Sequence, residues 1–304
     1  MKKIVVIGSL NMDFAVQVKD APKMGETVLA EGMKLIPGGK GANQAYAAAK
    51  LGGQVTMLGA VGTDSYGKVL ADNLAAVGAD VSHLKVTDEA STGVALVEVD
   101  QSGDNRIIVI SGANALVDIP YIDSKINVIA ESDIVVMQLE IPLETVIHAA
   151  KAAKKLGKLV ILDPAPARTD LPEELLRNVD IIKPNEHEVI AILGGGDLTQ
   201  EEAVRQLKEK GASSVLVTMG AAGSCYYGAD GETIHADAIT VDAVDTTGAG
   251  DSYTAALAVA IAEGADMAQA MALASKVGAM VTTKAGAQTS IPSRAEVIAW
   301  NAES

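Results

Sequence analysis

Hydrophobic residues in this chain form short apolar runs that alternate with longer amphipathic segments. The short runs have the length of strands and lie at residues 4–7, 55–58, 134–139, 159–162, 181–182 and 215–217. The longer segments have helical character and lie at residues 38–53, 66–77, 143–156, 186–193, 200–210, 249–263, 267–281 and 294–300. Strands that alternate with helices predict an α/β fold with a central, mostly parallel sheet covered by helices on both faces.

One region departs from this alternation. Residues 91–111 form two β-rich runs around a Gly/Asp/Asn turn, which predicts a hairpin, and residues 14–35 alternate without a helical period. We interpret the two together as a small antiparallel flap on the main sheet, a lid formed by about residues 14–36 and 92–110. No linker, repeat or low-complexity segment interrupts the sequence, so we expect one domain over residues 1–304.

The composition limits the possible partners and location. No window approaches the 18 or more uncharged apolar residues of a membrane span, and the apolar run after Lys3 is too short for a signal peptide. The single cysteine, Cys225, excludes an intrachain disulfide and fits the cytoplasm. The net charge of −15 argues against nucleic acid and anionic membranes as partners.

Polar clusters directly follow several of the predicted strands. They read GSLNMD, QLE, DPAP, KPNEHE and TMGAAG in chain order. Ligands of open parallel sheets bind beyond the carboxyl ends of the strands. These clusters therefore predict an active cleft at one edge of the sheet.

The segment DTTGAGD (residues 245–251) leads into an apolar helix. Gly248, Ala249 and Gly250 would present backbone amides at the start of that helix, where unpaired N–H groups and the helix dipole favour an anion. Asp251 lies in the first turn beside them. A simple cap is one interpretation. The other is phosphoryl transfer, with amides that stabilise the moving group and a carboxylate that orients the attacking hydroxyl.

The segment PGGKGANQA (residues 37–45) is the second glycine-rich stretch. It is not a Walker loop, because Gly41 rather than Ser or Thr follows Lys40, and the third glycine of a dinucleotide fingerprint is missing. Asn43 could cap the following helix or bind a ligand. By itself the segment fits a tight turn as well as it fits a ligand site.

Taken in order, the motifs GSLNMD, GGKGANQA, STGVAL, MQLEIP, DPAP, KPNEHE and DTTGAGD resemble those of the ribokinase family of sugar kinases over nearly the whole chain. The resemblance implies a ribokinase-like fold and an ATP-dependent sugar kinase. STGVAL and KAGAQTSIP are most similar to the members that phosphorylate D-ribose at O5. Alternatives are a member acting on deoxyribose, fructose, another sugar or a nucleoside, and a non-catalytic sugar or nucleotide sensor.

The resemblance also implies roles for individual residues. The sugar would be bound by Asn11, Asp13, Gly39, Lys40, Asn43 and Glu140. Asp251 would be the catalytic base, and the amides of Gly248, Ala249 and Gly250 would form the anion hole. The nucleotide would contact Asn185, Thr218, Gly220, Gly223, Gly250 and Ser275. Asp163 replaces the asparagine that the family more often has, so we assign it no role beyond a strand-end turn.

Two cations and a second subunit complete what the resemblance and the sequence imply. Glu188 would hold Mg²⁺, through water, near the phosphates. A monovalent cation, K⁺, would be bound mostly by backbone carbonyls at Asp245, Thr247, Val281, Lys284, Gly286 and Ser290. The exposed edges and apolar face of the predicted lid favour a homodimer.

Overall fold

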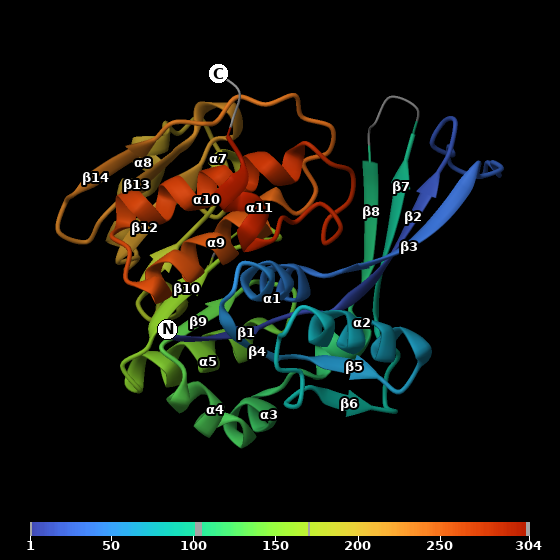
Figure 1. Ribbon diagram of the computed structural model, residues 1–304, viewed down its shortest axis with the longest axis horizontal. Helices are drawn as coiled ribbons and strands as arrows, with labels where there is room; N and C mark the ends of the chain where they lie inside the picture. Colours follow the sequence, from blue (N-terminus) through green and yellow to red (C-terminus); the bar gives the residue numbers. More distant parts are fainter. Residues whose placement is uncertain (1, 101–104, 170, 302–304) are drawn as a thin grey trace.

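A central sheet of eight strands forms the middle of the molecule in the computed structural model, which describes residues 2–100, 105–169 and 171–301 (Figure 1). Its strand order is β14-β13-β12-β11-β10-β9-β1-β4. The strands are β1 (Lys3–Ile7), β4 (Gln54–Leu58), β9 (Ile134–Met137), β10 (Leu159–Leu162), β11 (Ile181–Ile182), β12 (Ser214–Thr218), β13 (Ser224–Tyr227) and β14 (Thr233–Ala236). All pairs from β4 to β12 are parallel, and β13 and β14 add an antiparallel edge.

Helices cover both faces of this sheet, as the sequence predicts. Ile4 and Val6 of β1 face one buried core, and Val5 and Ile7 face the other, because successive strand residues point to opposite sides. The first core includes residues of α1 (Lys40–Lys50), α2 (Ser65–Ala76), α9 (Ala249–Glu263), α10 (Met267–Thr282) and α11 (Arg294–Ala299). The second includes residues of η1 (Gly112–Leu116), α3 (Ile119–Ser124), α4 (Ile126–Glu131), α5 (Leu143–Lys155), α6 (Glu173–Leu176), α7 (Glu186–Ala191) and α8 (Gln200–Glu209).

A second, four-stranded sheet has the order β3-β2-β7-β8 and stands beside the main body (Figure 1). Its strands are β2 (Asn11–Gln17), β3 (Gly32–Gly38), β7 (Gly93–Val99) and β8 (Asn105–Ile110). The predicted β7–β8 hairpin is confirmed, although its turn at residues 101–104 lies outside the described residues. The predicted all-antiparallel pairing is wrong, because β2 and β7 pair in parallel and the sheet is separate from the main one.

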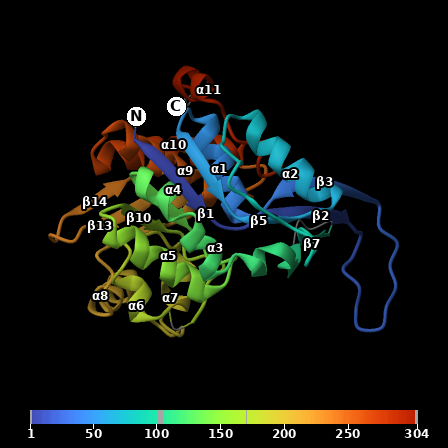
Figure 2. The same ribbon diagram turned by 90° about the horizontal axis from the view of Figure 1, so that it is seen from below.

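The small sheet differs from the prediction because its two inner strands continue from the main body in the same direction. β2 follows β1 after a short bend, and β7 enters beside it through Gly93, where an added Cβ would lie 2.3 Å from Oδ1 of Asn11. The connection between β2 and β3 projects away from the body (Figure 2). β5 (Ala60–Gly62) and β6 (Lys85–Thr87) form a further parallel pair that the hydrophobic pattern does not reveal.

The sheet topology places the polar clusters identified in the sequence at one edge. Because β1, β9, β10, β11 and β12 run in parallel, the segments after Ile7, Met137, Leu162, Ile182 and Thr218 share the carboxyl edge of the sheet. Helix α9 contacts β1, β9 and α1. Within the described residues, no helix combines the length and hydropathy that crossing a bilayer requires.

Candidate functional site

Asp251 lies in the first turn of α9, which begins at Ala249 as predicted. Gly248 caps the helix in a left-handed conformation with φ 76°, which glycine adopts without steric cost. The Ala249 amide donates to the carbonyl oxygen of Thr246 at 3.2 Å. Among the described residues, the amides of Gly248, Gly250 and Asp251 have no acceptor, so these are the donors that an anion would meet.

Both oxygens of the Asp251 carboxylate accept hydrogen bonds from α1. Asn43 Nδ2 donates to Oδ2 at 2.9 Å, and Gln44 Nε2 donates to Oδ1 at 3.1 Å. Asn43 therefore does not cap α1, a position that Gly39 takes. Its own Oδ1 accepts from Gln288 Nε2 at 3.0 Å, which links it to the segment after α10. The two glycine-rich motifs thus meet at one carboxylate.

Two sugar-site candidates lie at the start of β2, where Asn11 pairs with Gly38 and Asp13 pairs with Ile36. Asn11 is buried, and its Oδ1 accepts from Asn114 Nδ2 at 2.7 Å. The Oδ1 atom of Asp13 is buried without a hydrogen-bond partner among the described residues. Burial, together with the negative charges of Glu140 and Asp251, raises the pKa of Asp13 to about 7. Asp13 is therefore a buried carboxyl whose free acceptor atom suits a hydroxyl donor.

The glycines of the GGKG segment permit close approach of the backbone to β2. A Cβ at Gly38 would lie 2.1 Å from Asp13 Oδ2, and one at Gly39, which has φ +87°, would lie 2.7 Å from the Asn11 amide nitrogen. Any larger residue at these positions would push the α1 turn away from β2. Their need for glycine is steric, and it explains the motif independently of any ligand.

Lys40 and Glu140 meet at the same edge. Glu140 Oε2 accepts from Ser9 Oγ at 2.5 Å and from the Lys40 amide at 3.0 Å. Burial opposes the charge of the Lys40 ammonium, but the carboxylates of Asp251, Asp163, Glu140 and Glu188 outweigh it and raise its pKa. Lys40 is thus a permanent cation among four acids, which locally offsets the strongly negative charge of the chain.

Sequence reasoning missed a buried ion pair beneath this site. Lys183 Nζ lies 3.4 Å from Asp163 Oδ2, and each side chain is 3% exposed. The same ammonium lies 3.4 Å from the carbonyl oxygen of Gly250, at the start of α9. Burial raises the pKa of Asp163 more than the positive charges of Lys183 and Lys40 lower it, and the net pKa is about 6. Asp163 is therefore more than a strand-end turn residue. The sequence feature that could have predicted this ion pair is Lys183, a second charged residue directly after the neighbouring strand.

Asn185 and Glu188 form a capping box at the start of α7. Asn185 Oδ1 accepts from the Glu188 amide at 2.8 Å, and Glu188 Oε2 accepts from the Asn185 amide at 2.8 Å. One carboxylate oxygen of Glu188 thus has the structural role of capping the helix, as an acid in the first turn often does. The other oxygen takes no part in the box. Glu188 also contributes to the electrostatic environment of Lys40 and Asp163, so it faces the same edge of the sheet.

The predicted nucleotide residues lie along β12 and its turn. Thr218 ends β12, forms a parallel bridge with Asn185, and precedes a turn with Gly220 and Gly223 at positive φ. A Cβ at Gly223 would lie 2.2 Å from the carbonyl oxygen of Ala236. Across from this turn, Tyr253 forms side-chain hydrogen bonds with Ser224 and Ser275. Ser275 is therefore brought to this end of the sheet, as expected.

The predicted K⁺ residues lie on two segments joined by Asp245. Its Oδ1 accepts from the Thr247 amide at 2.9 Å, and its Oδ2 accepts from the Gly286 amide at 2.8 Å. Burial raises the pKa of Asp245, but hydrogen bonds from Thr247 and Gly286 lower it more, so the net shift is downward. The Lys284 ammonium points to Glu296 at 3.9 Å, which leaves only its backbone for a cation.

The remaining predicted cation ligands lie at the end of α10 and in the turns that follow it. The Lys284 amide donates to the Val281 carbonyl at 3.3 Å, and the buried Ser290 hydroxyl donates to Ala287 O at 2.7 Å. Among the described residues, no group of three or more His, Cys, Asp or Glu side chains is arranged to hold a metal ion. The donor set therefore suits a weakly held hard cation bound by carbonyls, or a hydrated Mg²⁺, rather than a caged metal.

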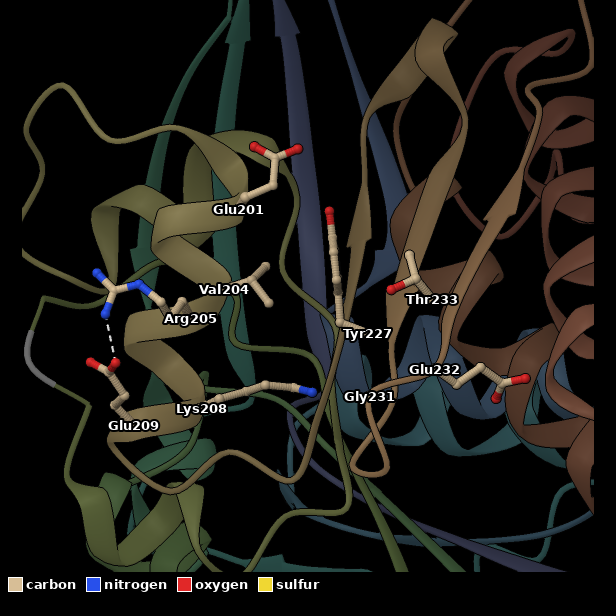
Figure 3. A pocket seen from close by; sticks show the side chains of 9 residues that line it. All are labelled: Glu201, Val204, Arg205, Lys208, Glu209, Tyr227, Gly231, Glu232 and Thr233. Atoms are coloured by element: carbon tan, nitrogen blue, oxygen red, sulfur yellow. Dashed lines mark hydrogen bonds and ion pairs between the residues drawn. The ribbon is translucent and has the colours of Figure 1, made fainter.

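A shallow pocket elsewhere on the surface does not belong to this site. It lies between α8 and the turn of the β13–β14 hairpin and is lined by Glu201, Arg205, Lys208, Tyr227 and Thr233, among others (Figure 3). Tyr227 pairs with Val215 near the start of β12, whereas Ser224 pairs with Thr218 at its carboxyl end. The pocket is thus at the opposite end of β12 from the converging polar residues.

Comparison with known proteins agrees with this geometry. Residues 1–294 match the pfkB family of carbohydrate kinases. A ribokinase of Bacillus subtilis (strain 168) is 39% identical over 297 residues, 98% of each chain, and a deoxyribokinase of Salmonella typhi is 38% identical over 293 residues, 95% of each chain. The structure of Arabidopsis thaliana ribokinase complexed with ribose and ATP has a TM-score of 0.91 at 35% identity, covering 98% of both chains. The chain belongs to the pfkB family of carbohydrate kinases.

Proposed function

We propose that this protein transfers the γ-phosphoryl group of ATP to O5 of D-ribose, giving D-ribose 5-phosphate and ADP. The observation that carries the proposal is the position of Asp251, at a helix N-terminus with unused amides and within electrostatic reach of both Asp13 and Lys40. A carboxylate beside an anion hole is what in-line transfer to a hydroxyl requires. The choice of ribose as the sugar rests on the similarity to ribokinases.

The sugar would lie between β2 and the start of α1. Asn11, Asp13 and Glu140 offer amide and carboxylate groups for its hydroxyls, and Gly39 allows the chain of α1 to close on it. A site with buried acceptors discriminates against sugars that lack the matching hydroxyl, because an acceptor is then left unpaired. Asn43, whose Nδ2 donates to Asp251 Oδ2, would bind a sugar hydroxyl next to the base.

The phosphoryl group would lie over the start of α9. The amides of Gly250 and Asp251 are free to bind its oxygens, while the Ala249 amide first has to leave Thr246 O. Lys40 adds a fixed positive charge beside Asp251. Asp251 then accepts the proton of the sugar hydroxyl as the bond to phosphorus forms and the bond to ADP breaks.

The nucleotide would extend along the turn after β12, past Thr218, Gly220 and Gly223, with its base near Ser275 and its phosphates near Asn185. Mg²⁺, when bound, would neutralise charge on the transferring phosphates. Glu188 is the residue that would hold it through water, using the carboxylate oxygen that the capping box leaves unused. K⁺ would be held by the two segments that Asp245 joins.

The small sheet would contribute to closure of the site and to assembly of a dimer. The small sheet would act as a lid over the sugar and exclude water from the transfer. Its outer strands expose Met33, Leu35 and the run of residues 107–110, an apolar face that a second subunit would bury. We therefore include a homodimer in the proposal. A cytoplasmic location fits the single, buried, unpaired Cys225.

The decisive experiment measures ADP release with Mg²⁺-ATP and K⁺ against a panel of D-ribose, 2-deoxyribose, fructose and a nucleoside. D-ribose should give the highest kcat/KM. The similarity to a deoxyribokinase makes 2-deoxyribose the second candidate, and a preference for it would replace ribose in the proposal. Sugar binding by calorimetry without turnover of any of the four would instead indicate a sensor. Asp251→Asn is the matched control for contaminating kinase activity.

A further inference from the structure

Gln44 is a buried polar residue that the proposed chemistry does not use. It follows Asn43 on α1, and its side chain has no exposed surface. Its Nε2 donates both to Asp163 Oδ2 at 2.9 Å and to Asp251 Oδ1 at 3.1 Å. Its Oε1 accepts from Gln138 Nε2 at 2.6 Å. A single amide therefore connects two buried carboxylates and one further amide.

The direction of these bonds is fixed by the partners. Ionised carboxylates only accept, so the amide nitrogen of Gln44 must face Asp163 and Asp251, and its carbonyl must face Gln138. The absence of a side chain at Gly8 leaves room for Gln138, because an added Cβ there would lie 2.0 Å from Gln138 Oε1. Reversing the Gln44 amide would point a carbonyl oxygen at two carboxylates, which is strongly unfavourable in a buried site.

Gln44 and Asn43 hold different oxygens of Asp251. In the proposed function, Asn43 also binds the sugar, so its bond to Oδ2 competes with the substrate. Gln44 is fully buried and has no access to the sugar, so its bond to Oδ1 persists whether or not the site is filled. This bond keeps the plane of the carboxylate fixed while Oδ2 changes partner.

We propose that Gln44 is a positioning residue, whose amide aims the Asp251 carboxylate at the acceptor hydroxyl while also linking it to the Asp163–Lys183 pair. The inference rests on the proposed function. A misplaced carboxylate slows transfer because the reacting atoms must be held within a narrow range of distance and angle. Substrate binding does not involve Gln44, so its loss should affect kcat rather than KM.

The experiment is a double-mutant cycle measured as kcat and KM for ribose and ATP. Gln44→Met keeps the length of the side chain without its hydrogen bonds, and should lower kcat about 10- to 100-fold with both KM values changed less than about threefold. In the Asp251→Asn background the same change should have no further effect on kcat, because the group it positions has gone. A structural role would lower kcat by the same factor in both backgrounds, and that result would overturn the inference.

Two further variants keep the test decisive. Gln138→Leu removes only the bond that orients the Gln44 amide, and should lower kcat about threefold to tenfold even if Gln44→Met fails to fold. Thr145→Val is the control for a buried polar-to-apolar change, because the Thr145 hydroxyl has no partner within the described residues, and it should leave kcat unchanged. Unchanged kcat in Gln138→Leu contradicts the inference. Failure of the wild-type protein to phosphorylate any sugar contradicts the proposed function instead.

Discussion

The side chain of Asn43 donates to Oδ2 of Asp251 at 2.9 Å, across a separation of 208 residues in the sequence. This bond joins the N-terminal turn of α1 to the N-terminal turn of α9, and so brings the segment proposed to bind the sugar next to the segment proposed for phosphoryl transfer. Both carboxylate oxygens of Asp251 are hydrogen-bonded, because Gln44 donates to Oδ1.

Asp251→Asn should lower kcat by about 10²- to 10⁴-fold, the range that general-base residues contribute. The amide cannot accept the hydroxyl proton, and its NH₂ group would face the donors Asn43 or Gln44. The KM for ATP should change little, because the nucleotide residues lie along β12. Initial rates of ADP release with ribose check this, and a kcat within a factor of about ten of wild type would remove Asp251 from the mechanism.

The affinity for ribose should rise with pH because Asp13 has a raised pKa of about 7. The protonated form stabilises the folded state relative to the ionised form, and this contribution is complete below the ordinary pKa of 3.8 and lost as the pH rises through about 7. Ionised Asp13 accepts two sugar hydroxyls, so the KM for ribose should fall between about pH 6 and pH 8.

The matched variant for this effect is Asp13→Asn. It should show a higher but pH-independent KM for ribose, and it should unfold at a higher urea concentration than wild type at about pH 8, since no buried charge forms. The KM for ATP over the same pH range is the internal control. If the KM for ribose of the two proteins changes in parallel with pH, Asp13 is not the titrating group.

Replacing only Lys183 of the Asp163–Lys183 pair should destabilise the fold more than replacing both residues. Lys183→Met leaves Asp163 buried without its cation, which should lower the free energy of unfolding by about 3–5 kcal/mol. The double variant Asp163→Asn, Lys183→Met contains no unpaired charge and should recover most of that loss. Urea unfolding followed by circular dichroism measures both, and equal losses in the single and double variants would show that the pair is not coupled.

Asp245→Asn should weaken K⁺ binding, so that activation needs more K⁺. The carboxylate holds the Thr247 and Gly286 amides on neighbouring segments, and its negative charge favours a cation between them. The K⁺ concentration for half-maximal activity should rise about tenfold or more. Titration with KCl at constant ionic strength tests this, with LiCl as the control salt. An unaltered K⁺ requirement would place the cation elsewhere.

Ile108→Lys should convert the proposed homodimer into a monomer. Ile108 lies on β8, is 64% exposed, and belongs to the apolar run on the outer strand of the small sheet. A buried lysine without a partner destabilises an interface strongly. Val86→Lys is the matched control, because Val86 is also 64% exposed but lies on β6. Sedimentation velocity of the three proteins decides, and an unchanged mass for Ile108→Lys argues against this face as the interface.

Local patterns were sufficient to predict the parallel strands of the main sheet and most of the covering helices, but not the antiparallel edge strands β13 and β14 or the short helices α3, α4 and α6. The expected helix at residues 249–263 coincides with α9, because Gly248 and Gly264 bound a continuous apolar segment at left-handed φ. The parallel order of strands followed from their alternation with helices. The position of Asp251 at a helix N-terminus was predictable for the same local reason.

Long-range pairing was harder to predict. The parallel contact of β2 with β7 depends on chain paths through the main body, which hydrophobic alternation does not encode. The Asp163–Lys183 pair and the amide of Gln44 join segments that meet only because β10 and β11 are neighbours and α1 crosses their ends. A glutamine within an alanine-rich helix was the visible signal for Gln44, since a buried amide needs partners.

The span between Asn43 and Asp251 also affects when the protein becomes competent during synthesis. Sheet strands up to β12 leave the ribosome before α9, so a nascent chain can pair most of its parallel strands while the base is still missing. The pocket for the sugar would then exist without the group that activates the hydroxyl. In the proposed function, phosphoryl transfer would therefore begin only after α9 has been made and packed against α1.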